Sequence, residues 1–425
     1  MRLLPLLLLA CTGPVPGTNN PPADPASPPA DTDAPSSGDT DAPSPADTDA
    51  PTSTNLRVAT FNVSLYRTSQ GALADELRDD DESNAAIAAA ILQDLRADVV
   101  LLNEVDFDAS GEVVDLLRTG FLEVAQEGRA PLSYPYAFVP EVNTGVPSGL
   151  DLDGDGVSDH PEGTQGYGND AFGFGEFPGQ YGMVLLSRYP ITASRTFRLL
   201  RWDAMPSNAM PADFYSEAAA QALRLSSKTH ADVTVDVEGT PLHLLISHPT
   251  PPAFDGAEQR NKRRNQDEIR LWVDYLHDAA WITDDDGVGG GLGDASFVIL
   301  GDLNADPHDG NSLPGAIDAL LDHPRVHDTQ PTSAGAVRQA TGSADANHVG
   351  PHNQDTADFA PWVGNLRVDY ALPSSDLEVT GSGVLWPEPE DPTFPLFGTF
   401  PHPLTDHRPV WVDVVLRSAP ADQPQ

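Results

Sequence analysis

The sequence has a single cysteine and few basic residues. Because Cys11 is the only thiol among 425 residues, no disulfide can form within the chain. Lys and Arg number 23 against 64 Asp and Glu, which gives a formal net charge of -41. This charge repels phosphate-rich polymers at long range and argues against a protein that coats DNA non-specifically. A local phosphate site is still compatible with it, because a bound cation reverses the local electrostatics.

Apolar residues, in contrast, are sufficient for a sizeable core. They make up 39% of the chain and include 6 Trp and 15 Phe. The length would hold two or three average domains, but large α/β folds also reach it as one. Apolar strands and amphipathic helices recur from residue 56 to 417, so we expect one folded domain there.

The N-terminus resembles a bacterial lipoprotein signal. Arg2 precedes a leucine-rich run that is too short to span a bilayer and that ends at Ala10-Cys11. Cleavage of residues 1–10 and lipidation of Cys11 would tether the chain to the bacterial cell envelope, and by resemblance Thr12 favours the outer membrane. The alternative is an ordinary secretory peptide with an incidental cysteine. Membrane contact is expected through the lipid anchor only.

Residues 11–55 consist mainly of Pro, Ala, Asp, Ser and Thr. The sequence Asp-Thr-Asp-Ala-Pro repeats from Asp31, Asp39 and Asp47. Such a composition cannot bury a core, so it predicts an extended, disordered stalk. Residues 418–425 are expected to form a disordered tail.

The segment Ser296–Asn304 is an apolar run that closes on two polar side chains. Residues 297–300 indicate a buried strand that stops at Gly301. Asp302 and Asn304 follow, and residues at i and i+2 of an extended chain point to the same face. The strand therefore presents a carboxylate and an amide together, although a purely structural turn has the same sequence.

The same pattern, a polar side chain beside an apolar strand, recurs at Asn62, Glu104, His248, Asp369, Asp406 and His407. The expected strands span residues 56–63, 98–104, 242–248, 366–372 and 404–412. A carboxylate at the end of a buried strand is costly unless it is paired or bound to a metal. Each residue alone also fits turn chemistry, a salt bridge or a satisfied core histidine. The ordered set favours a functional site.

Residues 258–281 predict a long amphipathic helix. Ile269, Trp272 and Ala280 are expected on its inward face. The first half carries the only dense basic patch, which consists of Arg260, Lys262, Arg263 and Arg264. This patch is either a solvated helix face or a contact for phosphate.

The segment Asp151–Glu162 has the spacing of a calcium-binding loop. The ligand positions 1, 3, 5, 7, 9 and 12 of such a loop fall on Asp151, Asp153, Asp155, the Val157 carbonyl, Asp159 and Glu162. Ser158 stands where an apolar residue is usual, and the Gly- and Pro-rich flanks cannot form EF-hand helices. We expect an isolated Ca²⁺ loop that rigidifies an insert at about residues 141–180. The alternative is an acidic turn without an ion.

The ordered set of polar strand ends resembles the endonuclease/exonuclease/phosphatase superfamily of DNase I-like proteins. The resemblance covers about residues 56–416 without the insert. It implies an α/β fold, a four-layer sandwich in which two mixed β-sheets pack face to face between helices. The stretches 179–190 and 223–272 are similar to secreted bacterial members.

The resemblance also implies a ligand set and catalytic roles. Glu104, Asn62 and Asp406 would bind Mg²⁺ or Mn²⁺, which prefer oxygen ligands. Asp302 would activate or position the attacking water.

Four further side chains would act on the phosphate or beside it. Asn304 and His248 would hold phosphate oxygens. His407 would act on the phosphate or as an acid/base, and Asp369 would orient it.

We therefore expect a divalent-metal-dependent phosphoesterase that hydrolyses phosphodiester or phosphomonoester bonds outside the cytoplasm. One version is an extracellular nuclease, and the other is a small-molecule or lipid phosphatase or sphingomyelinase-like phosphodiesterase. An alternative of another class is a catalytically idle, calcium-stabilised binding module. The expected partners are Mg²⁺ or Mn²⁺ at the active site, Ca²⁺ in the insert and a phosphoester substrate, and the protein is expected to be a monomer.

Overall fold

The computed structural model describes residues 53–79 and 83–417. The expected signal peptide, the lipidation of Cys11, the stalk up to residue 52 and the tail lie outside these residues and stay predictions. No helix within the described residues is long and apolar enough to cross a membrane.

One mixed sheet has six strands in the order β12-β13-β1-β2-β4-β3. Its members are β1 (Ser53–Leu65), β2 (Val99–Val105), β3 (Tyr136–Phe138), β4 (Met183–Ser187), β12 (Glu378–Val384) and β13 (Val410–Arg417). β1 and β2 run parallel, whereas the other neighbours pair antiparallel. The central strands are apolar on both faces, as expected for strands that are covered on both sides.

The second mixed sheet has five strands in the order β11-β8-β7-β6-β5. Its members are β5 (Ile191–Thr196), β6 (His230–Val237), β7 (Thr240–Ser247), β8 (Phe297–Asp302) and β11 (Asp369–Pro373). Only β7 and β8 run parallel. A separate two-stranded sheet pairs β9 (Ala357–Asp358) with β10 (Asn365–Leu366).

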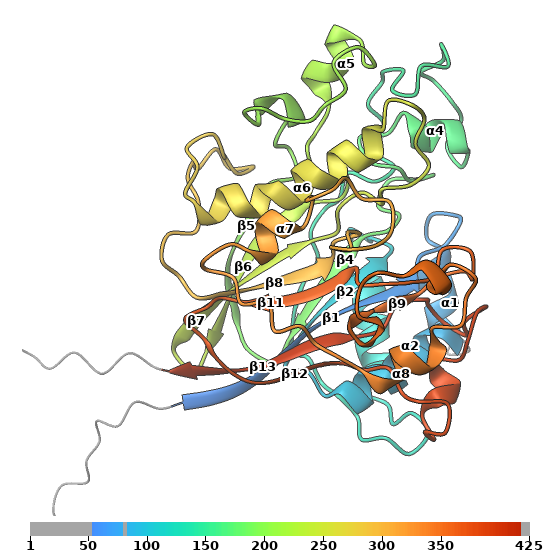
Figure 1. Ribbon diagram of the computed structural model, residues 1–425, viewed down its shortest axis with the longest axis vertical. Coiled ribbons are helices and arrows are strands. Elements are labelled where there is room, and N and C mark those ends of the chain that lie inside the picture. Colours follow the sequence, from blue (N-terminus) through green and yellow to red (C-terminus); the bar gives the residue numbers. More distant parts are fainter. Residues whose placement is uncertain (1–52, 80–82, 418–425) are drawn as a thin grey trace, which may run out of the picture. The chain divides into compact units, whose positions relative to one another are not determined.

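The two large sheets pack face to face through an apolar layer. Val58 and Leu101 from one sheet and Val233, Ile246 and Leu300 from the other belong to one fully buried cluster. With helices on the outer faces, the described chain forms four layers, which confirms the expected α/β sandwich (Figure 1).

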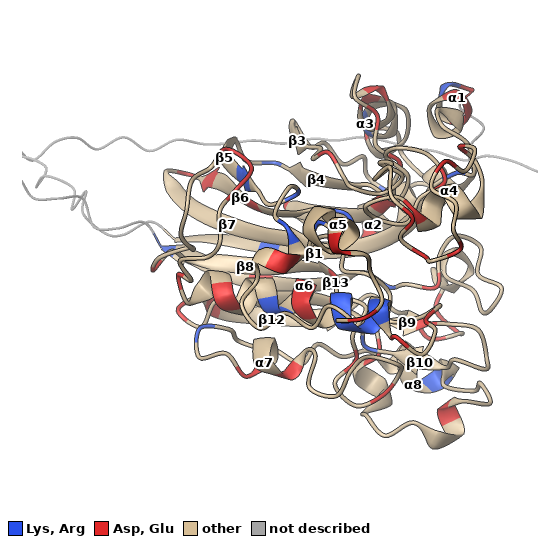
Figure 2. Cartoon of the chain, turned by 90° about the horizontal axis from the view of Figure 1, so that it is seen from above, with Lys and Arg blue, Asp and Glu red and all other residues tan. Residues whose placement is uncertain are grey.

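Helix α6 (Arg260–Leu276) covers the outer face of the five-stranded sheet (Figure 1). Trp272 is fully buried there, and its indole Nε1 donates to Ser247 Oγ at 2.9 Å, at the end of β7. Figure 2 shows Lys and Arg gathered on α6, while Asp and Glu are spread over the chain. Helix α7 (Asp318–Leu321) packs on the same face.

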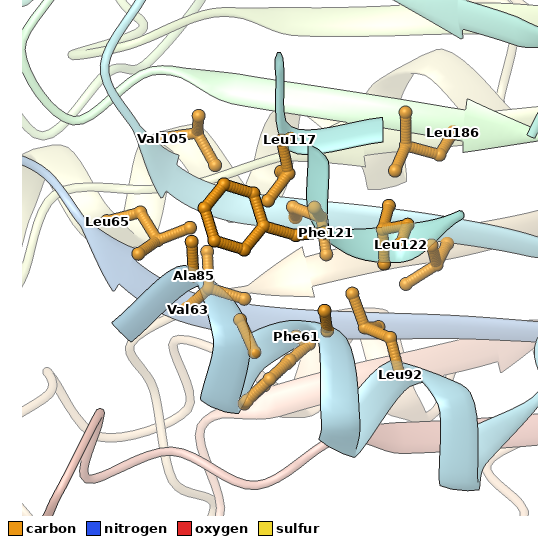
Figure 3. Packing of buried hydrophobic residues seen from close by; sticks show 14 of the residues in the cluster. Phe61, Val63, Leu65, Ala85, Leu92, Val105, Leu117, Phe121, Leu122 and Leu186 are labelled. Carbon is orange, nitrogen blue, oxygen red and sulfur yellow. The ribbon is translucent and has the colours of Figure 1, made fainter. Parts of the chain in front are cut away.

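Helices α1 (Ala72–Arg78), α2 (Ser83–Leu95) and α3 (Glu112–Leu116) cover the outer face of the six-stranded sheet. Figure 3 shows Phe61 and Val63 of β1 packed against Leu92 of α2 and Phe121. Because the side chains of β1 alternate, one set faces these helices and the other faces the second sheet.

Short elements complete the described fold. Further α-helices are α4 (Gln165–Asn169), α5 (Glu217–Ala222) and α8 (Ala334–Gln339). A π-helical turn spans Leu117–Leu122, and 3₁₀ turns span Trp202–Ala204, Asp345–Asn347, His352–Gln354 and Phe394–Leu396.

Several expected bounds were wrong. The helix expected at residues 258–281 ends at Leu276, because the chain reverses at Asp278 with φ 52, and Ala280 is exposed. The strand expected at 366–372 is two elements, so Asp369 is the first residue of β11 and not a residue in the middle of a strand. The last strand begins at Val410, so His407 lies in the segment before it.

Candidate functional site

Strand pairing brings the polar strand ends to one end of the sandwich. Asp302 at the end of β8 stands opposite Asp369 at the start of β11. In the other sheet Thr60 of β1 is paired with Val410, so the residues before β13 lie beside the end of β1. The two sheets meet at this end, where Asn62 Nδ2 donates to Asp302 Oδ2 at 3.2 Å.

The Asp302 carboxylate is the centre of the site. Its Oδ2 lies 3.4 Å from His248 Nε2 and 3.6 Å from His407 Nε2, in addition to the Asn62 contact. Its Oδ1 accepts the backbone N–H of Asn304 at 3.0 Å. Asp302 is 1% exposed, so these neighbours replace the water that a free carboxylate would bind.

A chain of side chains fixes the His407 ring from behind. His407 Nδ1 lies 2.9 Å from Asp369 Oδ2, and the same oxygen accepts a hydrogen bond from Thr356 Oγ1 at 2.9 Å. The Phe359 ring contacts the His407 ring edge-on, with the centroids 5.5 Å apart. With Nδ1 held by Asp369, Nε2 faces Asp302 and, at 3.7 Å, Asp406.

The charges of these groups depend on one another. Burial would raise the pKa of Asp302, but His407, His248 and Asn62 lower that pKa well below its ordinary value. Burial would lower the pKa of His407, but Asp369, Asp302 and Asp406 raise that pKa well above the ordinary value. Burial, partly offset by His407, raises the pKa of Asp369 to about 6. Both shifts favour an ionised Asp302 beside a protonated His407.

The oxygen donors of Glu104, Asn62 and Asp406 are of the kind that binds a hard divalent cation, whereas the described carboxylates and histidine whose ligand atoms cluster at this end are Asp302, Asp369 and His407. Glu104 is half-buried on β2. Among the described side chains, Ser64 donates a hydrogen bond from its Oγ to the Glu104 carboxylate at 3.5 Å. The backbone of Ser64 in turn donates to Asn62 Oδ1 at 3.2 Å. A carboxylate, an amide oxygen and a second carboxylate are the ligand types that Mg²⁺ prefers.

The backbone is strained at two of the predicted residues. Glu104 has φ 62 and Asn304 has φ 54, in the left-handed region that side chains other than Gly rarely adopt. Each such residue costs about 1–3 kcal/mol, and such outliers cluster at functional sites. The amide of Asn304 donates to the Pro249 carbonyl at 3.2 Å, beside His248.

Lys228 is a site residue that the sequence reasoning left out. It is 6% exposed, and Glu268, Glu104 and Asp302 are close enough to act on its charge. Burial outweighs these carboxylates and lowers the pKa of Lys228. Burial and the charge of Lys228 together lower the pKa of His248, whose Nδ1 is buried without a hydrogen-bond partner among the described residues. The only signal in the sequence was a single lysine shortly before strand β6.

Glu268 of α6 fixes the segments that carry Lys228 and His248. Its carboxylate accepts the backbone N–H groups of Ser227 and Thr250, each at 2.6 Å. Glu268 is fully buried, so these two bonds replace its hydration.

A cleft of about 570 Å³ opens beside the site. Its lining includes Ser64, Tyr66, Thr405 and Asp406, and it extends to Arg67 and His402. A substrate would therefore approach from the side on which Asp406 and Ser64, the hydrogen-bond partner of Glu104, lie.

The insert brings together part of the predicted calcium ligands. Asp151 and Asp153 cluster with Asp170, which was not predicted, and Asp170 Oδ2 is buried with no hydrogen-bond partner in the described part of the chain. The carboxylates of Asp155, Asp159 and Glu162 fall outside this cluster of described residues, and Asp155 Oδ2 lies 3.0 Å from His160 Nε2. The Val157 backbone N–H donates to Asp155 at 2.8 Å. The identity and position of any ion in the insert stay a prediction.

The arginines of α6 bind backbone carbonyl oxygens. Arg264 is half-buried and donates to the carbonyls of Phe172, Arg224 and Leu225 at 2.7–2.9 Å. Arg260 donates to the Leu152 carbonyl at 2.7 Å. These two arginines tie the insert to α6, so neither is a freely solvated part of the basic patch.

Two packed mixed sheets with carboxylates and histidines at one shared end define a DNase I-like α/β sandwich. The model of the Endonuclease/Exonuclease/phosphatase family matches residues 59–407, and the chain belongs to this family. Members are typically hydrolases that act on phosphoester bonds and use divalent metal ions. No curated protein sequence matched the chain.

Similar solved structures share low sequence identity with this chain. An endonuclease/exonuclease/phosphatase from Beutenbergia cavernae is 20% identical, with a TM-score of 0.46 over 86% of this chain and 73% of that one. Sphingomyelinase C from Streptomyces griseocarneus is 17% identical, with a TM-score of 0.41 over 85% and 99%. A magnesium-bound beta toxin variant from Staphylococcus aureus is 14% identical, with a TM-score of 0.41 over 84% and 99%.

Proposed function

We propose that this protein is a divalent-metal-dependent phosphoesterase. The observation that carries the proposal is the buried Asp302 carboxylate, which lies between Asn62, His248 and His407. Glu104, Asn62 and Asp406 hold Mg²⁺ or Mn²⁺ in this proposal. When bound, the ion supplies positive charge that stabilises the phosphoryl oxygens.

Asp302 and His407 carry the proton chemistry. Because its pKa is lowered, Asp302 is an acceptor at neutral pH and can orient the attacking water through a hydrogen bond. Because its pKa is raised, His407 carries a proton on Nε2, which can be donated to a phosphoryl oxygen. Asp369 positions His407 by accepting from Nδ1.

His248, Asn304 and Lys228 recognise the phosphate oxygens. His248 keeps a buried, unpartnered Nδ1, which becomes a donor when an anionic substrate favours its protonated form. The Lys228 ammonium is buried beside the same carboxylates and offers a second positive charge. A phosphate group would satisfy both at once.

The substrate is a small-molecule or lipid phosphoester in this proposal, and an extended duplex DNA is disfavoured. Arg260 and Arg264 of the one dense basic patch are already bonded to carbonyl oxygens. A protein that tracks a nucleic-acid backbone needs several free cations along its path. A nuclease that acts on short or single-stranded ends is the alternative.

The proposed place of action is the bacterial cell envelope, as an outer-membrane lipoprotein or a secreted monomer. The support is the N-terminal sequence that ends at Cys11. Replacement of Cys11 by Ser should move the protein from the membrane fraction to the soluble extracellular fraction. Retention of this variant in the membrane fraction would contradict lipid anchoring.

A panel of phosphoesters tests the activity. The substrates are p-nitrophenyl phosphate, its bis-p-nitrophenyl diester, sphingomyelin, DNA and RNA, each with Mg²⁺, Mn²⁺ or Ca²⁺. Turnover should need a divalent ion and fall at least about 100-fold in Asp302→Asn. The control is Asp115→Asn, an exposed carboxylate on α3 that should leave turnover unchanged. Metal-independent turnover, or full activity of Asp302→Asn, would refute the proposal.

A further inference from the structure

Two histidines and an aspartate converge in the loop before β9, outside the site described above. His348 Nε2 lies 3.4 Å from Asp355 Oδ1, and His352 Nδ1 lies 3.3 Å from Asp355 Oδ2. One ligand atom from each residue lies within 4.8 Å of the others. The two imidazole rings are stacked, with centroids 4.2 Å apart and an interplanar angle of 16°.

His352 Nδ1 and Asp355 Oδ2 form a hydrogen bond at 3.3 Å, but one buried polar atom of the cluster has none. The His348 side chain is 4% exposed, and its Nε2 is buried without a hydrogen-bond partner among the described residues. Asp355 is 1% exposed. An unpartnered buried polar atom costs about 1–3 kcal/mol, so a native site of this kind calls for a bound species that satisfies it.

The Asp309 carboxylate lies near the other ring nitrogen of His348. Its Oδ2 lies 3.4 Å from His348 Nδ1, while the backbone N–H groups of Val349 and Gly350 hold the same carboxylate at 2.8–3.1 Å. A carboxylate near Nδ1 favours the tautomer in which Nε2 carries a lone pair, the usual arrangement of a metal-binding histidine. The lone pair of His348 is then directed toward Asp355.

The donor set and its spacing fit a transition metal of the zinc class. Two imidazole nitrogens and one carboxylate suit Zn²⁺, Co²⁺ or Ni²⁺, whereas Mg²⁺ and Ca²⁺ prefer oxygen ligands alone. Ligand atoms on a tetrahedral Zn²⁺, with bonds of about 2.0–2.1 Å, lie about 3.4 Å apart. His348 Nε2 lies 3.4 Å from Asp355 Oδ1 and His352 Nδ1 lies 3.3 Å from Asp355 Oδ2, so each imidazole nitrogen has a different oxygen of this carboxylate at that spacing. His352 is 31% exposed, which leaves the fourth position open to water.

The surrounding charge also favours a cation. Burial raises the pKa of Asp355, and Asp306, Asp345 and Asp309 are all close enough to raise it further. None of these carboxylates belongs to the proposed Mg²⁺ ligands. A divalent ion here would offset negative charge that the loop otherwise concentrates.

We propose that His348, His352 and Asp355 bind one transition-metal ion of the zinc class, separate from the Mg²⁺ ligands at Glu104. The ion fixes the loop directly before Thr356, whose hydroxyl donates to Asp369. The metal therefore helps to position Asp369, and through it His407, because the ligand Asp355 directly precedes Thr356.

Cobalt substitution tests the site without any assay of activity. The full chain, stripped of metal and kept in excess Mg²⁺, should bind one equivalent of Co²⁺ with the intense visible bands of a four-coordinate ion, and Zn²⁺ should displace it. His352→Ala and Asp355→Asn should lose these bands. His277→Ala is the matched control, because His277 belongs to another pair of histidine rings, with His323. Glu104→Gln should keep the bands.

A second measurement covers the case in which a variant does not fold. Zn²⁺ should raise the melting temperature of the wild-type chain and of Glu104→Gln equally, because an ion that binds only the folded state stabilises it. Wild-type protein that binds no Co²⁺ equivalent in excess Mg²⁺, bands that persist in His352→Ala, or a Zn²⁺ response that is lost in Glu104→Gln would each overturn the proposal.

The positioning effect rests on the proposed phosphoesterase function and has its own readout. Zinc removal by His352→Ala should lower kcat about tenfold with KM nearly unchanged, since second-shell changes typically cost that much. Unchanged kcat would overturn the coupling to Asp369. Absence of activity in the wild type would refute the proposed function, while the cobalt spectrum would still decide the metal site.

Discussion

His230 should make the stability of this protein fall steeply in mild acid. His230 is the first residue of β6 and is 1% exposed, and its ring packs against Trp272 with the ring centroids 5.0 Å apart. Nδ1 lies 2.6 Å from Ser226 Oγ and Nε2 lies 2.9 Å from the Glu268 carbonyl oxygen. Burial lowers the pKa of His230 to about 4, so the folded protein keeps this ring neutral.

The size of the effect follows from the two protonation equilibria. An unfolded histidine has a pKa of about 6.5, so the unfolded chain binds more protons between about pH 6.5 and pH 4. Stability is therefore fully present above the unfolded pKa and is lost as pH falls toward the folded pKa. Between pH 7 and pH 5 the expected loss from His230 is about 2 kcal/mol.

Urea unfolding at pH 7 and pH 5 measures this term when wild type is compared with His230→Gln. The glutamine amide can still donate to the Glu268 carbonyl but does not titrate. Wild type should lose about 2 kcal/mol more than the variant on acidification. The control His277→Gln removes an exposed histidine and should respond to pH like wild type. Equal losses in wild type and His230→Gln would refute the reasoning.

Three further predictions concern the site and the insert. If Asp369 acts only through His407, Asp369→Asn added to His407→Ala should lower kcat hardly more than His407→Ala alone, whereas losses that multiply would show separate roles. Lys228→Met should lower kcat/KM about 100-fold, since a buried phosphate contact is lost. The variant should not have a lower melting temperature, since burying an ammonium is costly, and a large drop would show that Lys228 is mainly structural. Calcium chelation should lower the melting temperature of wild type by about 5 °C and leave Mg²⁺-dependent turnover at low temperature unchanged. The double variant Asp153→Ala with Asp155→Ala should show no calcium response, and a response equal to that of wild type would place the ion elsewhere.

The sequence predicted most strand ends because those signals are local, whereas the sandwich was implied by the family resemblance of the ordered set. The apolar runs at 99–102 and 297–300 are buried strands, and the polar residues Glu104 and Asp302 lie at their ends. Parallel pairing of β1 with β2 and of β7 with β8 then requires those ends to meet at a shared edge.

Other features depend on contacts that are distant in the sequence. Lys228 lies in the site because the Glu268 carboxylate accepts the backbone N–H of the preceding residue, Ser227, from which it is 41 residues away in the sequence. Asp170 joins Asp151 although it lies outside the expected loop motif. Arg264 donates to carbonyls that are 40 and 92 residues away in the sequence, and a helical pattern cannot reveal such contacts.

The dependence of turnover on Mg²⁺ in Glu104→Gln tests the central claim most directly. The glutamine keeps the shape of the side chain and the half-buried position on β2 but lacks the charge that attracts a hard cation. We expect unchanged folding by circular dichroism, a Mg²⁺ requirement raised at least about tenfold, and turnover lowered about 100-fold or more at saturating Mg²⁺. Wild-type turnover of Glu104→Gln at the wild-type Mg²⁺ concentration would contradict the account.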